Sequence, residues 1–139
     1  MRIKSLYYIV VFLLISASVF GDVLEIYHLD VDQGDATLFI LPNKKTLLVD
    51  VGADSKGPIV AHFIRSKNIQ SIDAVLITHY DSDHYGGIDK LAESGIEVKN
   101  WYHRGQWNYL PPSKLDDHDF IEFSNTVSDP ITVFAGMNI

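Results

Sequence analysis

Short apolar runs separated by polar turns follow one another along most of the chain. Runs of about four to eight residues bounded by Gly, Pro, Asn or Asp are typical of β-strands. The pattern predicts strands at residues 23–31, 37–41, 46–51, 72–78, 96–102 and 131–135. Only polar residues 42–45 separate the second run from the third, so these two strands are expected to form a hairpin. The run 72–78 is almost continuously apolar, which is typical of a strand buried on both faces.

Two further segments have the spacing of helices. Apolar side chains recur at helical intervals within residues 58–67, and Pro58 suits the first turn of a helix. A shorter helix is predicted over residues 88–94, with Gly95 in the position that ends it. Strands and helices in this order predict a single α/β domain in which helices pack on a sheet.

The N-terminal segment has the pattern of a secretory signal peptide. Two basic residues precede an apolar run at 6–15, and small residues continue to Gly21. Cleavage after Gly21 would leave a mature domain of residues 22–139, and cleavage after Ser18 is an alternative. The run is shorter than the about 20 apolar residues that span a bilayer. We therefore expect a secreted or periplasmic protein without a stable membrane span after signal removal, rather than one with an uncleaved anchor.

Composition narrows the chemistry that the domain can perform. The chain is 47% hydrophobic and 12% aromatic, as in ordinary globular domains. Without the two basic residues of the signal segment, the chain has nine Lys and Arg and eighteen Asp and Glu, so it is strongly acidic. A broad nucleic-acid-binding surface is therefore not expected. Because the chain has no Cys, any metal ion must bind through His, carboxylate or water.

Four potential metal ligands lie within six residues, between a predicted strand and a predicted helix. They are His79, Asp81, Asp83 and His84. Imidazole nitrogen and carboxylate oxygen suit zinc and manganese, and two such ions can share a bridging water. The segment, called the metal loop below, is predicted to help hold up to two divalent ions. The rival interpretation is a solvated polar turn, which the ligand density and the flanking elements disfavour.

Two adjacent glycines, Gly86 and Gly87, follow the metal loop. Here the chain must pass close to bound ions and then start a helix, and glycine permits both. A side chain at either position is expected to crowd the metal site.

Three segments together resemble a known family. Residues 77–88, ITHYDSDHYGGI, closely resemble the His-x-His-x-Asp-His motif of metallo-β-lactamase-fold hydrolases. Asp81 stands in place of the second His, as in the metallo-β-lactamase-like domain of the DNA-uptake protein ComEC. Residues 29–36 resemble the Val-Gly-Gln-Gly-Asp turn of that subgroup, and residues 48–52 resemble its strand-ending Asp-x-Gly.

Two residues within these motifs change what we expect of the bound metal and of the turn. The carboxylate of Asp81 adds negative charge, which shifts the expected metal from strictly zinc toward manganese or mixed occupancy. Asp32 stands where the subgroup usually has Gly. Asp is among the residues that best tolerate a positive φ.

The resemblance implies a role for each candidate site residue. The first His and Asp of the metal loop would bind one metal ion, and Asp83 and His84 would bind the second. Asp83 would also orient the attacking hydroxide, which makes it the catalytic candidate. Asp35 and Asp50 would lie beneath the site as outer carboxylates that fix the geometry of the ligands.

The resemblance also implies an αββα sandwich, of which this chain covers only the first half, a mixed sheet with flanking helices. The domain at residues 22–139 is therefore expected to be truncated. The other half normally supplies a further His, a bridging Asp and a last His. The later histidines here are His103 and His118, and both are expected to be surface residues rather than ligands.

The implied function is that of a secreted, ComEC-like, metal-dependent hydrolase. Its metal-activated hydroxide would attack an ester, preferably a phosphoester, in a small-molecule or phosphoester substrate. Two alternatives remain open: a truncated or degenerate relative that binds metal without catalysis, and a binding module with a structural metal site. In each case a missing C-terminal half or a partner would be needed to cover the open face of the sheet.

Overall fold

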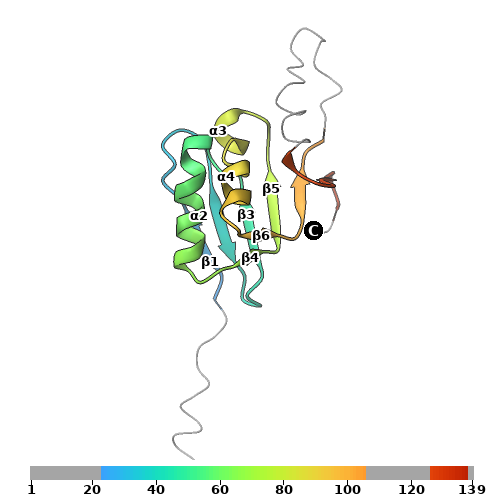
Figure 1. The fold of residues 1–139 in the computed structure, drawn as a ribbon. Coiled ribbons are helices and arrows are strands. Elements are labelled where there is room, and N and C mark those ends of the chain that lie inside the picture. The colour runs from blue at the N-terminus through green and yellow to red at the C-terminus, as the bar shows by residue number, and fades with distance from the viewer. Residues whose placement is uncertain (1–22, 106–125, 138–139) are drawn as a thin grey trace, which may run out of the picture.

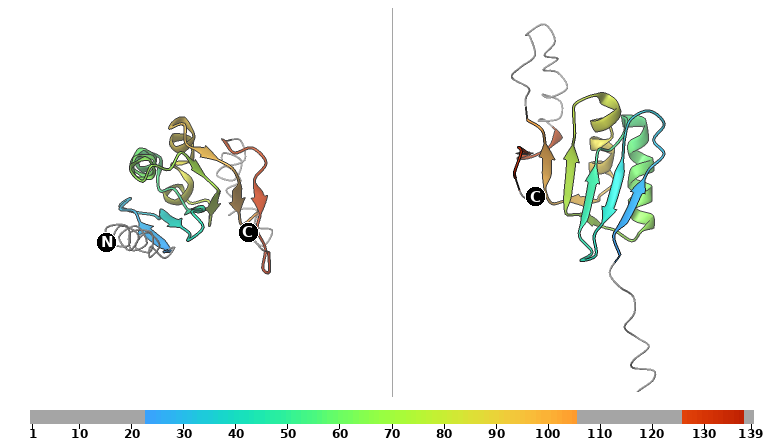
Figure 2. Two further views of the ribbon diagram at one scale, coloured as in Figure 1. Left: turned by 90° about the horizontal axis from the view of Figure 1, so that it is seen from below. Right: turned by 180° about the vertical axis from the view of Figure 1, so that it is seen from behind.

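A computed structural model describes residues 23–105 and 126–137 of the chain. In this part, a six-stranded sheet carries its helices on one face (Figures 1 and 2). The predicted signal peptide and His118 lie outside the described residues. None of the described helices is long and apolar enough to cross a membrane.

The main sheet is mixed, with strand order β1-β2-β3-β5-β7-β8. Its strands are β1 (Glu25–His28), β2 (Thr37–Ile40), β3 (Thr46–Val49), β5 (Ala74–Ile77), β7 (Trp101–His103) and β8 (Ile131–Thr132). The predicted hairpin is confirmed, because β2 pairs antiparallel with β3, with Thr37 opposite Val49. β1 is also antiparallel to β2, whereas β3, β5, β7 and β8 run parallel to one another.

The described helices are η1 (Asp54–Lys56), α2 (Gly57–Ser66), α3 (Ser82–Tyr85) and α4 (Ile88–Glu93). α2 and α4 lie where the sequence predicts helices, whereas η1 and α3 lie in segments that were expected to be loops, α3 at the C-terminal end of the metal loop. Pro58 lies in the first turn of α2, as expected. Gly95 follows α4 with φ 78°, which confirms its predicted role in ending that helix.

The core lies between the sheet and the helices α2 and α4. Its fully buried side chains include Leu38, Leu48 and Val75 from the sheet, and Ile64 and Leu91 from the two helices. The opposite sheet face has no covering helix among the described elements, as the view from behind shows (Figure 2). The hydrophobic core of the described structure is therefore one-sided.

Two predicted strands are each divided into two. The run 72–78 breaks at Asp73 into β4 (Ser71–Ile72) and β5, and the run 96–102 breaks at residues 99–100 into β6 (Glu97–Val98) and β7. β4 and β6 pair in a separate two-stranded sheet. Asp73 explains the first break, because its carboxylate accepts hydrogen bonds from the backbone N–H of Thr46 and from Lys99.

The expected burial of β5 on both faces is wrong. Val75 and Ile77 are fully buried against the helices, whereas Ala74 and Leu76 on the other face are partly exposed. The second face of this apolar strand is therefore one that no described element covers.

Candidate metal centre

The candidate ligands meet where two neighbouring parallel strands end. β3 and β5 pair in parallel, with Val49 opposite Leu76. Asp50 follows β3, and His79 follows β5 after Thr78. Because the carboxyl ends of parallel strands lie at one edge of a sheet, residues far apart in the chain come together there.

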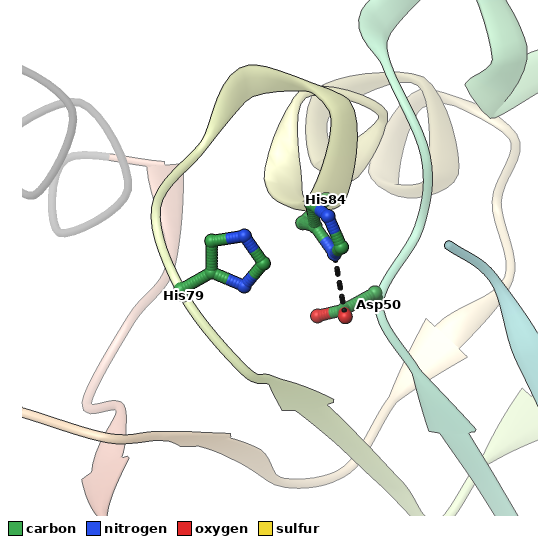
Figure 3. Close-up of side chains that lie close together, drawn as sticks. All are labelled: Asp50, His79 and His84. Atoms are coloured by element: carbon green, nitrogen blue, oxygen red, sulfur yellow. Dashed lines mark hydrogen bonds and ion pairs between the residues drawn. The ribbon is translucent and has the colours of Figure 1, made fainter. Parts of the chain in front are cut away.

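Asp50 is the most constrained polar residue of the site. It is 2% exposed. Its Oδ1 accepts a hydrogen bond from the Thr78 backbone N–H at 2.8 Å, and its Oδ2 accepts one from the Thr78 hydroxyl at 2.6 Å. The same Oδ2 lies 2.9 Å from Nδ1 of His84 (Figure 3). A carboxylate can only accept, so Nδ1 carries the proton of this contact, and Nε2 is the nitrogen left to bind a metal ion.

His79 completes a group of three possible ligands. Its ring centroid lies 3.8 Å from that of His84, and its Nδ1 lies 3.0 Å from the Thr78 hydroxyl. One ligand atom from each of Asp50, His79 and His84 lies within 4.8 Å of the other two. Figure 3 shows the three side chains converging from the ends of the two strands and from α3. Two imidazoles and a carboxylate at this spacing fit a divalent cation such as zinc or manganese.

The other two residues of the metal loop each lie near one imidazole. Asp81 Oδ2 is 3.4 Å from His79 Nε2, and Asp83 Oδ1 is 4.0 Å from His84 Nε2. The Asp81 side chain is 77% exposed and the Asp83 side chain 22%. Two His–Asp pairs side by side are compatible with the expected two-metal arrangement. The assignment of ligands to individual ions stays a prediction.

The two glycines after the metal loop are required for a different reason from the one expected. A β-carbon on Gly87 would lie 2.5 Å from the Val51 carbonyl oxygen and 2.9 Å from the α-carbon of Gly57. One on Gly86 would lie 2.4 Å from the carbonyl oxygen of Ser82. The glycines thus permit close contact with the end of β3, the start of α2 and α3.

Asp35 is not placed beneath the site as the sequence predicts. Its side chain is exposed, and its backbone carbonyl accepts a hydrogen bond from the N–H of Gly52 at 2.9 Å. The neighbouring Gly34 makes the closer approach, since a β-carbon there would lie 1.8 Å from the carbonyl oxygen of Asp83. The contact of this turn with the metal loop was not predicted, although the Asp-Gln-Gly-Asp motif is its sequence signal.

The comparison with protein families agrees with this arrangement. Residues 29–132 match the family model described as the metallo-beta-lactamase superfamily. The chain belongs to this superfamily. The mixed sheet with flanking helices is the predicted fold class, which is thereby confirmed.

Several relatives match parts of this superfamily domain. The anti-Pycsar protein Apyc1 of Paenibacillus sp. (strain J14) is 49% identical over 47 residues, which cover 34% of this chain and 18% of that protein. A hydroxyacylglutathione hydrolase of Francisella tularensis is 34% identical over 71 residues, or 51% of this chain and 28% of the relative. A solved metallo-beta-lactamase of Cronobacter sakazakii shares 26% identity with a TM-score of 0.44, covering 52% of this chain and 30% of that one. The match thus spans less than a third of each relative.

A pocket of about 560 Å³ opens beside the superfamily's metal loop. Asp81 and Asp83 line it from the loop, and Asp32 and Lys56 line it from the facing turn and η1. Asp32 has φ 60°, a conformation that Asp tolerates better than most residues, and its carboxylate forms an ion pair with Lys56. The predicted catalytic residue Asp83 therefore borders this pocket, whereas Asp50, His79 and His84 are not among the residues that line it.

His103 is buried, contrary to the expected surface position. It is 3% exposed, and its Nδ1 lies 2.6 Å from the Tyr80 hydroxyl. Burial lowers the pKa of His103, although a hydrogen bond to the backbone of Pro130 opposes this shift. The imidazole contacts the metal loop through Tyr80, and it is not in the group of possible ligands formed by Asp50, His79 and His84. The sequence signal for this burial is the position of His103 at the end of an apolar strand.

Proposed function

We propose that this chain forms the metal-binding part of a secreted or periplasmic hydrolase of the ComEC-like subgroup. The observation that carries this proposal is the convergence of the His79 and His84 imidazoles, whose ring centroids lie 3.8 Å apart, beside the buried Asp50 carboxylate. Membership of the metallo-beta-lactamase superfamily supports it. The subgroup rests on the carboxylate of Asp81 in the loop, and the localisation rests on the N-terminal sequence pattern.

Each residue of the centre has a definite task in this proposal. The pair His79 and Asp81 would hold one divalent ion, and Asp83 and His84 a second, with zinc or manganese as the metal. A divalent cation bound there supplies a Lewis acid and makes hydroxide available near neutral pH. Asp50 holds the His84 ring in the tautomer whose Nε2 faces the ion, through the 2.9 Å contact to Nδ1.

Asp83 is proposed as the residue that orients the attacking hydroxide. Its side chain is 22% exposed, and it lines the pocket beside the metal loop. A carboxylate there can accept a hydrogen bond from water in the pocket and hold it toward a substrate. No other acidic residue proposed here as a ligand combines partial burial with a position on this pocket, because Asp81 is largely exposed.

The proposed substrate is an ester, with a phosphoester preferred. The pocket lining contributes Asp32, Asp81 and Asp83 against Lys56, so the protein alone would repel an anion. Two divalent cations would reverse the sign of this local charge and attract a phosphate group. The hydrolase name of the Francisella tularensis relative supports hydrolysis as the reaction class.

The complete enzyme is proposed to include a C-terminal half or a partner that this structure does not contain. The match covers less than a third of the relatives' length. In addition, apolar side chains such as Phe39, Leu47 and Val49 are only partly buried on the sheet face away from the helices. A second layer would cover this face.

A second candidate function is a non-catalytic, metal-binding relative. The observation that favours it is that all candidate ligands come from one edge of one sheet. Such a site can hold an ion without forming a complete catalytic centre.

The hydrolase proposal is tested with the full chain, manganese or zinc, and bis(p-nitrophenyl) phosphate as a generic phosphodiester. We expect nearly two ions per chain and metal-dependent hydrolysis that Asp83→Asn lowers by about 100-fold or more. Asp129→Asn is the matched control, because Asp129 is exposed and lies on the C-terminal segment. One bound ion with no hydrolysis would support the non-catalytic alternative, and no bound ion would contradict both.

A further inference from the structure

Tyr80 of the metal loop and His103 of β7 form a buried polar contact. The Tyr80 hydroxyl lies 2.6 Å from His103 Nδ1, and the two residues are 8% and 3% exposed. Tyr80 stands between His79 and Asp81 in the loop, whereas His103 ends β7. The contact therefore joins the loop to a strand that is distant in the sequence.

The partners of His103 determine which ring nitrogen carries the proton. The Gly105 backbone N–H can only donate, and its nitrogen lies 3.3 Å from His103 Nδ1. Nδ1 is therefore unprotonated, and the Tyr80 hydroxyl donates to it. The Pro130 carbonyl can only accept, and it also hydrogen-bonds to the imidazole. Nε2 is thus the donor, and it lies 3.2 Å from the Thr132 hydroxyl oxygen.

Both groups lie in buried surroundings that suit these protonation states. Burial lowers the pKa of His103, and the Arg104 guanidinium lies 5.2 Å from the centre of the Tyr80 ring. The phenol O–H thus faces an imidazole nitrogen that lacks a proton, which is the arrangement for a full hydrogen bond.

We propose that His103 is a positioning residue, which fixes the metal loop between His79 and Asp81 through the Tyr80 hydroxyl. This inference rests on the proposed metal site. The far end of the loop is held by backbone hydrogen bonds, from His84 N–H to the Asp81 carbonyl and from Val51 N–H to the His84 carbonyl, each 2.8 Å. The Tyr80 contact supplies an anchor at the near end.

The inference is tested on the full chain with Tyr80→Phe, which removes the hydroxyl and keeps the ring. We expect about five-fold weaker binding of Co²⁺, as for the loss of one buried hydrogen bond. We also expect about five-fold faster amide exchange within residues 79–84 and unchanged exchange in β2 and β3. Tyr102→Phe is the matched control, because it removes the same hydroxyl from a half-buried position on β7, and both readouts should stay at wild-type values.

Two substitutions of His103 separate positioning from simple packing. In His103→Asn the amide can present an oxygen near the place of Nδ1 and so keep the acceptor for Tyr80. In His103→Gln the longer side chain places its polar atoms nearer to Nε2. We expect His103→Asn to restore loop protection and Co²⁺ affinity toward wild-type values, and His103→Gln to behave like Tyr80→Phe.

The outcomes distinguish this inference from the proposed function. Unchanged loop exchange in Tyr80→Phe, or equal behaviour of the two His103 variants, overturns the positioning role. If the wild-type chain binds no Co²⁺, the metal-site proposal fails. The exchange rates alone then decide whether His103 holds the loop.

Discussion

Asp50 is held in an unfavourable backbone conformation by the hydrogen bonds of its side chain. It has φ 56°, a left-handed conformation that costs about 1–2 kcal/mol for most residues and is better tolerated by Asp. Three hydrogen bonds, from the backbone and hydroxyl of Thr78 and from His84, offset this cost. Its buried carboxylate can therefore hold a ligand ring in place, in the manner of outer carboxylates at metal sites.

Asp50→Asn is predicted to weaken manganese or zinc binding by about 10- to 100-fold. The amide keeps the shape of the side chain, but it cannot accept from both Thr78 and His84 with both terminal atoms. Asp35→Asn is the matched control, because the Asp35 side chain is exposed and its contact to Gly52 uses the backbone carbonyl. Isothermal titration of both variants measures the effect, and equal losses would show that the burial of Asp50 is irrelevant.

His103 is predicted to make stability depend on pH. Burial lowers its pKa in the folded chain below the ordinary 6.5, so the unfolded chain binds a proton more readily. The free energy of unfolding should therefore fall as the pH drops below about 6.5, with no contribution from His103 above it. Urea unfolding between pH 5 and 8 measures this slope. His103→Asn should have a smaller slope over the same range, and identical slopes would refute the assignment.

At the scale of elements, what could be predicted from the sequence was local. The hairpin of β2 and β3, the end of α4 at Gly95 and the grouping of His79 with His84 all follow from neighbouring residues. The break at Asp73 and the burial of His103 depend on partners more than 20 residues away. Pattern alone does not specify such partners, because spacing carries no information about long-range contacts.

The turn at Gly34 gives a prediction at this scale. A β-carbon there would lie 1.8 Å from the Asp83 carbonyl oxygen, and Gly34 has φ 97°. Gly34→Ala should therefore lower the free energy of unfolding by about 2–4 kcal/mol, from backbone strain and overpacking together. Gly95→Ala shares a positive φ but has only an Arg65 side-chain atom 3.9 Å away, so it should lose about 1 kcal/mol. Equal losses in denaturant unfolding would mean that the turn does not pack against the metal loop.

At the scale of the whole molecule, the described structure is a six-stranded sheet with helices on one face, together with the short two-stranded sheet of β4 and β6 (Figure 2). Adjacent residues of a strand point to opposite faces, so Leu48 is fully buried against the helices and Leu47 is partly exposed. The metal loop lies at the carboxyl ends of the strands, where the candidate ligands that follow β3 and β5 meet. A second layer on the open face would therefore lie next to the metal site.

Leu48→Ala is predicted to lower the free energy of unfolding of the full chain by about 2–5 kcal/mol, as for a buried leucine. Leu47→Ala makes the same change on the other face and should cost about 1 kcal/mol, since less apolar surface is removed from water there. Chemical denaturation of both variants measures the difference. Similar losses would indicate that the second face is already covered in the isolated chain.

The most direct test of the metal centre is the metal content of the full chain after equilibrium dialysis against manganese or zinc. His84→Ala removes a ligand that Asp50 holds in place, whereas His62→Ala removes an exposed imidazole from α2. We predict bound metal, approaching two ions per chain, in the wild type and in His62→Ala, and a loss of at least one ion in His84→Ala. A wild-type chain without bound metal, or a His84→Ala variant that retains it fully, would contradict the account.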